Sequence, residues 1–314
     1  MMLLKESVYI FLVWGKRNLR NIWRWRYFYL LLTPTLLYFI VFSYIPFYGV
    51  VIAFKNFQPF LGIWDSPWVG WKNFETMFSS VKFPELIRNT VLISIYRIIF
   101  GFPVPILFAL LLNEVRVMWF KRSIQTIAYF PHFLSWVIFG GIIYNVVGPS
   151  GIINLVLEKF GIDTINLSAN PDLFRPLVVA TGILKEFGWA AIIYLAALTG
   201  IDPHLYEAAK IDGASKLRQI WHITLTGIRP MIAMLLILQL GSVLDAGFEQ
   251  ILILSNPVVY SVGDIIDTYV YRVGLLEANY GLATAVGLFK GVIAAILIVS
   301  ANHIIRRTGE KSLW

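Results

Sequence analysis

The sequence predicts an all-α integral membrane protein with six transmembrane helices. The first observation is composition, because 58% of the 314 residues are hydrophobic and 14% are charged, whereas a soluble domain has about a quarter charged residues. The second is the recurrence of apolar runs of about 20 residues, the length that crosses a bilayer as a helix. The third is an aromatic content of 16%, typical of helices anchored at both membrane interfaces.

The apolar runs place the spans in order along the chain. We expect them at residues 27–51, 89–113, 124–147, 177–199, 231–254 and 281–304. The second contains GFPVP at 101–105, where two prolines should bend or break the helix because each removes a backbone donor. The sixth carries small residues four apart on one face, which favour close packing within the chain or against another subunit: Ala283, Gly287, Gly291 and Ala295.

The predicted organisation is one transmembrane domain, residues 27–305, between a basic segment at 1–26 and a tail at 306–314. The basic segment interleaves tryptophans with Lys and Arg, which is typical of an interfacial helix and equally of a positive flank that orients the first span. Alternate connections and both termini carry 16 Lys and Arg against seven on the other side. Both termini are therefore expected in the cytoplasm.

Several classes of function are disfavoured. The net charge of +8 suggests orientation and anionic lipid contact rather than nucleic acid. The chain has no cysteine, its four histidines lack metal-ligand spacing, and it has neither a G-x-x-x-x-G-K-[ST] nor a G-x-G-x-x-G nucleotide motif. We therefore expect no enzyme, no metal and no cofactor in this chain; if ATP drives it, another chain binds the nucleotide.

Ionisable residues inside the expected spans indicate a polar cavity near the middle of the membrane, since a charge facing lipid costs several kcal/mol. Asp245 and Glu249 should share a helix face, although the DAGFEQ run around them suggests a loosened helix. Nearby aromatic rings offer flat surfaces for sugars; the alternative is structural ion pairing and ordinary packing. The candidate cavity residues are Arg97, Tyr96, Trp136, Lys185, Glu186, Trp189, Asp245, Glu249 and Lys290, with Phe187 and Tyr194 as further aromatic groups.

A polar stretch at 207–230 interrupts the apolar chain on the expected cytoplasmic side. Asp202 followed by Pro203 is a good helix start, and Gly213 suits its end. The sequence thus predicts a short helix over about 203–213. Alanines at its centre would let it seat closely in the groove of a partner.

The order E-A-A, three residues, G, nine residues, I-x-L resembles the signature loop of permease subunits of binding-protein-dependent ABC importers. In this chain it comprises Glu207-Ala208-Ala209, Gly213, Ile223 and Leu225. The family usually has proline after that leucine, and Thr226 here puts only the local bend in doubt. The runs YLLLTPTLLYFIVFSYIPFYGVVIAFKNF, GFPVPILFALLLNE and QTIAYFPHFLSWVIFGG are similar to the polysaccharide-type, maltose-permease-related branch.

This resemblance implies a MetI-like fold in a bacterial cytoplasmic (inner) membrane. It implies a second homologous permease, two ATPase subunits that bind ATP and magnesium, and an extracytoplasmic solute-binding protein. The cargo would be an oligosaccharide or polysaccharide, with an acidic one such as alginate as a further option. The short helix would be the coupling helix that contacts the ATPase, through Glu207, Ala208, Ala209, Asp212 and Gly213.

Two other classes of function remain open from the residues alone. An ion- or proton-coupled secondary transporter would use the intramembrane charges as its coupling site. A membrane scaffold would recruit a partner through its basic face without solute flux. Uptake that persists in sealed vesicles after removal of the ATPase subunits would favour the secondary transporter.

Overall fold

A computed structural model describes residues 23–241 and 243–307. In this part of the chain, helices are the regular secondary structure, apart from one isolated bridge between Lys55 and Trp68. Six segments of the described chain are long and apolar enough to cross a membrane, which confirms the predicted number. They are Arg26–Phe54, Lys82–Glu114, Trp136–Lys159, Pro171–Thr199, Lys216–Gly241 and Tyr280–Ser300. The predicted interfacial helix at 1–26 lies almost wholly outside the described residues, as does most of the tail at 306–314.

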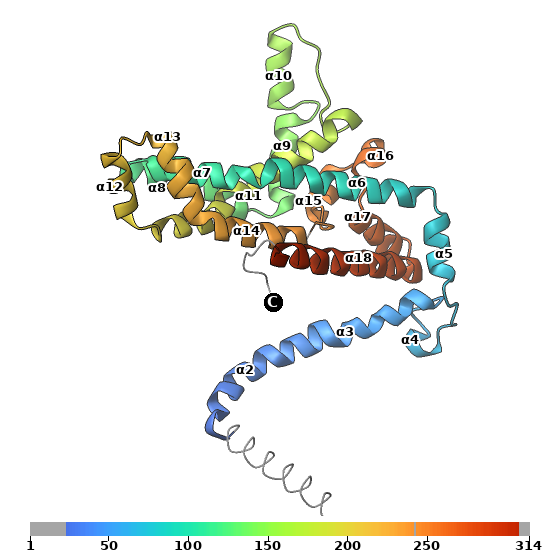
Figure 1. Cartoon of the computed structure of the whole chain (residues 1–314). Coiled ribbons are helices and arrows are strands. Elements are labelled where there is room, and N and C mark those ends of the chain that lie inside the picture. The colour runs from blue at the N-terminus through green and yellow to red at the C-terminus, as the bar shows by residue number, and fades with distance from the viewer. Residues whose placement is uncertain (1–22, 242, 308–314) are drawn as a thin grey trace, which may run out of the picture.

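Most of the first span stands apart from the rest of the molecule (Figure 1), but its last part, Tyr48–Phe54, packs against the sixth span. It runs without interruption through its component helices, and only 6% of its most apolar window is buried. Its parts are α2 (Arg26–Phe39), a π-helical turn (Ile40–Tyr44), α3 (Ile45–Phe47) and a 3-10 helix (Tyr48–Phe54). Two short helices follow before the second span, α4 (Gly62–Asp65) and α5 (Lys72–Ser79).

The second span is continuous through its prolines. It comprises α6 (Lys82–Tyr96), a π-helical turn (Arg97–Gly101) and α7 (Pro103–Glu114). Of the bend or break expected at GFPVP, the break does not occur, whereas a π-helical turn of the kind that bends helices is present at Arg97–Gly101. The π-helical turn directly before Pro103 already departs from regular α-helical pairing, so that α7 begins at the proline instead of being interrupted by it.

The third expected span, 124–147, is wrong as a single helix. α8 (Met118–Tyr129) passes into a 3-10 turn (Phe130–Phe133), and the chain is extended at Leu134 and Ser135 before α9 (Trp136–Val147) begins. The Ser135 hydroxyl accepts a hydrogen bond from Ile138 N, which makes it the N-cap of α9. Beyond α9, the helix α10 (Ile152–Lys159) projects from the body (Figure 1).

The fourth span, α11 (Pro171–Thr199), is the central helix and packs against α7, α8, α14 and α15. The fifth, expected at 231–254, is wrong as one helix. It consists of α14 (Leu225–Gly241), a non-helical stretch at 243–247 and α15 (Phe248–Leu254). The loosened helix predicted at DAGFEQ is confirmed, and Gly247 provides the turn with a left-handed φ of 88°.

Short helices close both ends of the bundle. α12 (Pro203–Ile211), α13 (Lys216–Gln219) and a π-helical turn (Ile220–Thr224) precede α14, and they lie with α8 at one end of the body (Figure 1). α16 (Tyr260–Gly263), α17 (Ile266–Tyr271) and a π-helical turn (Arg272–Leu276) lead into the sixth span, α18 (Tyr280–Arg307). Connections expected on the cytoplasmic side thus lie together.

Candidate functional site

Helix α12 forms where its start and stop signals predict. The Asp202 side chain accepts a hydrogen bond from His204 N at 2.9 Å, and Pro203 occupies the first helical position, where a missing N–H is harmless. The helix ends at Ile211, and Gly213 takes a left-handed φ of 73° just beyond it. The predicted helix over about 203–213 is therefore confirmed to within two residues.

The face of α12 that carries the candidate coupling residues is largely accessible. Glu207 and Ala208 are exposed, as are Asp212 and Gly213 beyond the helix, and Ala209 is half-buried. His204 Nδ1 lies 3.3 Å from Glu207 Oε2, and both side chains are well exposed. A short helix with alanines and one carboxylate facing outward is suited to docking in a groove of another protein.

The inner face of α12 is tied to the start of the fifth span. Tyr206 Oη lies 3.0 Å from Thr224 Oγ1, and the Thr224 side chain is buried. The buried Gln219 donates to Ala214 O at 2.9 Å, and Lys216 pairs with Glu114 at the end of α7 at 2.7 Å. The analysis of the sequence missed Tyr206 and Thr224, because their pairing depends on how the loop folds back on itself.

Arg97 forms the polar centre of the membrane-spanning part. It donates to Gln250 Oε1, and the Gln250 amide in turn donates to Val178 O at 2.6 Å and Thr181 Oγ1 at 2.7 Å on α11. Its guanidinium also fills the space in which a side chain at Gly247 would stand. Gln250, fully buried in an apolar helix, was missed by the sequence analysis although such a burial signals a specific polar partner.

The residues at the break before α9 are partners for Lys185 and Glu186 on α11. Lys185 Nζ donates to Pro131 O at 3.2 Å and His132 O at 2.8 Å, and lies over the Trp136 ring at 5.4 Å. Glu186 Oε2 lies 2.7 Å from His132 Nδ1. Lys185 therefore donates to two carbonyls at the break, of which Pro131 O also accepts from Leu134 N. The contact of Glu186 with His132 was missed because that histidine belongs to no motif.

The ionisable residues that were expected in one polar cavity are divided among several cavities. A cavity of about 290 Å³ is lined by Arg97, Trp136, Glu186, Phe187 and Tyr194 among others. Arg97 also lines a neighbouring cavity of about 420 Å³ that reaches Asp245. Asp245 in turn lines a cavity of about 790 Å³ that contains Lys290. Arg97 and Asp245 thus connect three neighbouring cavities in sequence.

Some candidate residues lie elsewhere. Tyr96 faces a separate cavity beside Asp172 and Arg175. Glu249 is exposed on the first turn of α15, and the non-helical stretch at 243–247 separates it from Asp245, so the shared helix face expected for this pair is wrong. The Trp189 ring stacks on His132 at 4.5 Å between centroids with 43% of its surface exposed.

Comparison with known proteins places the chain among transport proteins. Residues 101–310 match the family described as binding-protein-dependent transport system inner membrane component. The polygalacturonan/rhamnogalacturonan transport system permease protein YteP of Bacillus subtilis is 45% identical over 300 residues, covering 95% of this chain and 94% of that protein. The protein LplB of the same organism is 46% identical over 290 residues, covering 92% and 91%.

Two solved structures share the fold over nearly the whole chain. One is a crystal structure of a bacterial ABC transporter involved in the import of the acidic polysaccharide alginate, with 41% identity, a TM-score of 0.86 and coverage of 93% of this chain and 99% of that one. The other is a bacterial alginate ABC transporter in complex with an alginate pentasaccharide-bound periplasmic protein, with 40% identity, a TM-score of 0.86 and coverage of 94% and 99%.

Proposed function

Because this chain belongs to the family of binding-protein-dependent transport system inner membrane components, we propose that it forms part of the pathway by which an ATP-driven importer takes up an acidic oligosaccharide. The chain contributes no hydrolytic chemistry. ATP and magnesium act in two separate ATPase subunits, a second homologous permease completes the pathway, and a solute-binding protein delivers the sugar from outside. A solved relative in complex with a sugar-bound periplasmic protein supports the last of these partners.

The accessible surfaces fit this assembly. The first span leaves nearly all of its apolar surface uncovered by the rest of the chain, which a second permease and the membrane lipid would cover. The exposed carboxylate of Glu207 on α12 offers a docking contact to an ATPase subunit. With α12 in the cytoplasm of a bacterial cell, both termini lie on the same side of the inner membrane, in agreement with the distribution of Lys and Arg.

The mechanism is alternating access. Closure of the ATPase pair moves α12. The contact of Tyr206 with Thr224 and the ion pair between Lys216 on α13 and Glu114 at the end of α7 transmit that movement to the spans around the cavities. The cavities then open to the outside, receive the sugar, and open inward when ATP hydrolysis resets the ATPase pair. Rigid contacts at both ends of the loop are essential, because a loosely attached helix would move without turning the spans.

The position of Arg97 is the main observation that supports an acidic sugar as the substrate. Its guanidinium lies where two cavities meet, and its Nε is buried without a hydrogen-bond partner among the described residues. A carboxylate on a sugar ring would supply the missing acceptor, and guanidinium–carboxylate pairs are among the strongest hydrogen-bonded contacts in proteins. Aromatic side chains such as Trp136 and Phe187 in the same cavity offer flat surfaces to the sugar ring.

Uptake of labelled trigalacturonate tests the proposal in cells that carry the whole importer. We expect Arg97→Gln to reduce uptake of the acid by about ten- to hundredfold, the value of a hydrogen bond to a charged group, and to affect the uncharged methyl ester much less. Deletion of the ATPase subunits should abolish both. Uptake that survives this deletion would instead support the ion-coupled transporter, and equal loss of acid and ester would remove Arg97 from charge recognition.

A further inference from the structure

The cavity around Lys290 has walls suited to a sugar. It has a volume of about 790 Å³ between the first span, α15, α17 and α18, and its lining includes the aromatic side chains of Phe248, Tyr271 and Tyr280. Cavities of this size hold small ligands, and aromatic walls with a few polar groups are the usual composition. The charged groups that face it are Lys290 on α18, Asp267 on α17 and Asp245 in the break before α15.

The row of small residues in the sixth span forms the floor of this cavity. Gly287 and Gly291 both line it, and apart from chain neighbours and the backbone of the helix itself, no atom of the described residues lies within 4 Å of the position that a Cβ would occupy at either glycine. Packing within the chain therefore does not explain this part of the row. The two glycines lie one helical turn apart, Gly291 directly after Lys290 and Gly287 three residues before it, and they leave a strip of open backbone that a flat ring can approach closely.

Lys290 already binds a carboxylate, that of Asp267. Its Nζ donates to both carboxylate oxygens, at 2.6 and 2.7 Å, and about a fifth of each side chain remains exposed (21% and 22%). The ammonium is therefore partly removed from water and compensated by one acidic group that solvent can still reach. A second carboxylate that enters the cavity can approach the same ammonium from the exposed side.

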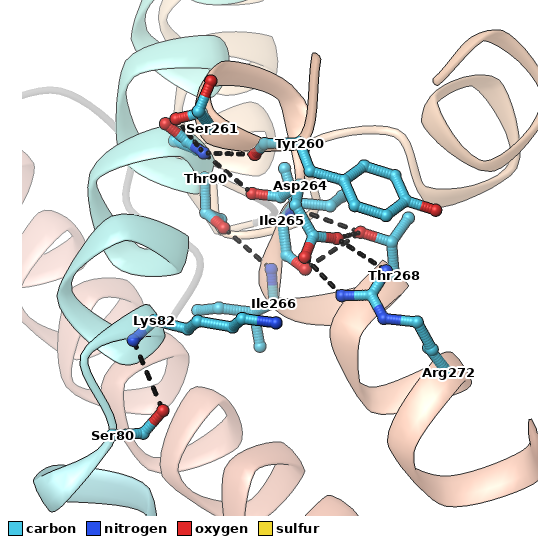
Figure 2. Close-up of polar contacts among 11 residues, drawn as sticks. Ser80, Lys82, Thr90, Tyr260, Ser261, Asp264, Ile265, Ile266, Thr268 and Arg272 are labelled. Carbon is cyan, nitrogen blue, oxygen red and sulfur yellow. Dashed lines mark hydrogen bonds and ion pairs between the residues drawn. The ribbon is translucent and has the colours of Figure 1, made fainter. Parts of the chain in front are cut away.

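Contacts that do not involve Asp267 anchor α17 independently (Figure 2). Arg272 pairs with Asp264 at 2.5 Å, and Thr268 donates to the same carboxylate at 2.7 Å. Ile266 N donates to Thr90 Oγ1 on α6 at 3.0 Å. Burial by itself would lower the pKa of Arg272, but the hydrogen bond and charge of Asp264 outweigh it and raise that pKa, so the guanidinium stays charged. Release of Asp267 would thus leave α17 in place.

We propose that this cavity is a second sugar subsite, in which the carboxylate of a uronic acid residue exchanges with Asp267 on Lys290. This inference rests on the proposed function and adds a selection step. The exchange replaces one carboxylate by another, so Lys290 keeps a compensating charge while Asp267 turns to solvent. A neutral sugar that displaced Asp267 would leave the ammonium uncompensated, and an uncompensated buried charge is strongly unfavourable.

The location of the subsite gives it a place in the pathway. Asp245 lines both this cavity and the one that contains Arg97, so a sugar that leaves Lys290 passes directly toward the guanidinium. Asp267 competes with the carboxylate of the sugar for Lys290. Lys290 therefore selects sugars that carry a carboxylate before they reach Arg97.

The decisive variant is Asp267→Asn, because it removes the competitor and predicts a gain. In cells with the complete importer, the KM for trigalacturonate should fall by about two- to fivefold, the factor that corresponds to a partly exposed ion pair, with no change for its methyl ester. Lys290→Met should raise the KM for the acid alone, and adding it to Asp267→Asn should abolish the gain. The matched control is Asp163→Asn, on an exposed residue outside this cavity.

Each other outcome overturns the inference in a recognisable way. If Asp267→Asn lowers uptake of acid and ester equally, the ion pair only supports α17. If Gly287→Val prevents co-purification of the second permease, the glycine strip is a subunit seam; the subsite instead requires reduced uptake by an intact complex. If wild-type cells import no trigalacturonate, the proposed function fails together with this inference, whereas wild-type import with unchanged selectivity in the variants removes the subsite alone.

Discussion

Gly247→Ala tests whether the break in the fifth span exists to seat Arg97. The φ of 88° at Gly247 lies in the left-handed region, where an alanine costs about 1–2 kcal/mol. The added Cβ would also stand where the Arg97 guanidinium lies. Moving the guanidinium away from Gln250 Oε1 removes a hydrogen bond to a charged group, worth about 1.5–3 kcal/mol. Together we expect a loss of about 2.5–5 kcal/mol in the stability of the folded state.

A double-mutant cycle separates the two contributions. In an Arg97→Ala background the clash and the hydrogen bond are already gone, so Gly247→Ala should cost only the backbone part, about 1–2 kcal/mol. Gly141→Ala is the matched control, because Gly141 is helical in α9 and has open space at its Cβ position. Alanine there should be neutral or stabilising by up to about 1 kcal/mol.

The assay is thermal unfolding of the assembled complex in detergent, read beside uptake of trigalacturonate in cells. Gly247→Ala should lower the unfolding temperature and reduce uptake of the acid more than uptake of the methyl ester. An equal cost of Gly247→Ala in the wild-type and Arg97→Ala backgrounds would refute the reasoning, because the glycine would then serve only the turn.

Two further predictions concern α12. Glu207→Ala should leave membrane insertion intact but reduce recovery of the ATPase subunits or raise the amount of ATP hydrolysed per sugar imported; unchanged assembly and uptake would refute its role as a coupling residue. Tyr206→Phe keeps the ring but removes the hydrogen bond to Thr224, worth about 1 kcal/mol, so the same ratio of ATP to sugar should rise by up to about fivefold while ATPase recovery stays normal. A fall in ATPase recovery that matches the fall in uptake would show that Tyr206 only stabilises the docked helix.

The elements that the sequence predicted correctly are those determined by residues close together in the chain. Composition and apolar runs predicted the number of spans, because each helix must satisfy its own backbone in lipid. Asp202, Pro203 and Gly213 predicted α12, because a cap, a first-turn proline and a left-handed glycine act within a few residues of each other. The E-A-A spacing predicted the family for the same reason.

The misplaced elements depended on partners distant in sequence. The third span was expected to begin within α8, but the chain breaks at Leu134 and Ser135, where the preceding carbonyls of Pro131 and His132 are satisfied by Lys185 from α11. The fifth span was expected to continue to residue 254, but it breaks where Arg97 from the second span occupies the space beside Gly247. Hydropathy does not record such contacts.

The sequence by itself determined that this protein has six membrane-spanning segments and a short capped helix between the fourth and fifth, because hydrophobic length and helix capping are local properties of the chain. Only the tertiary structure decided what the intramembrane charges do. The cations that were expected to share one polar cavity have separate partners. Arg97 contacts Gln250, Lys185 contacts the carbonyls before α9, and Lys290 contacts Asp267. A charge removed from water must find its partner across the bundle, and the identity of that partner depends on which helices pack side by side.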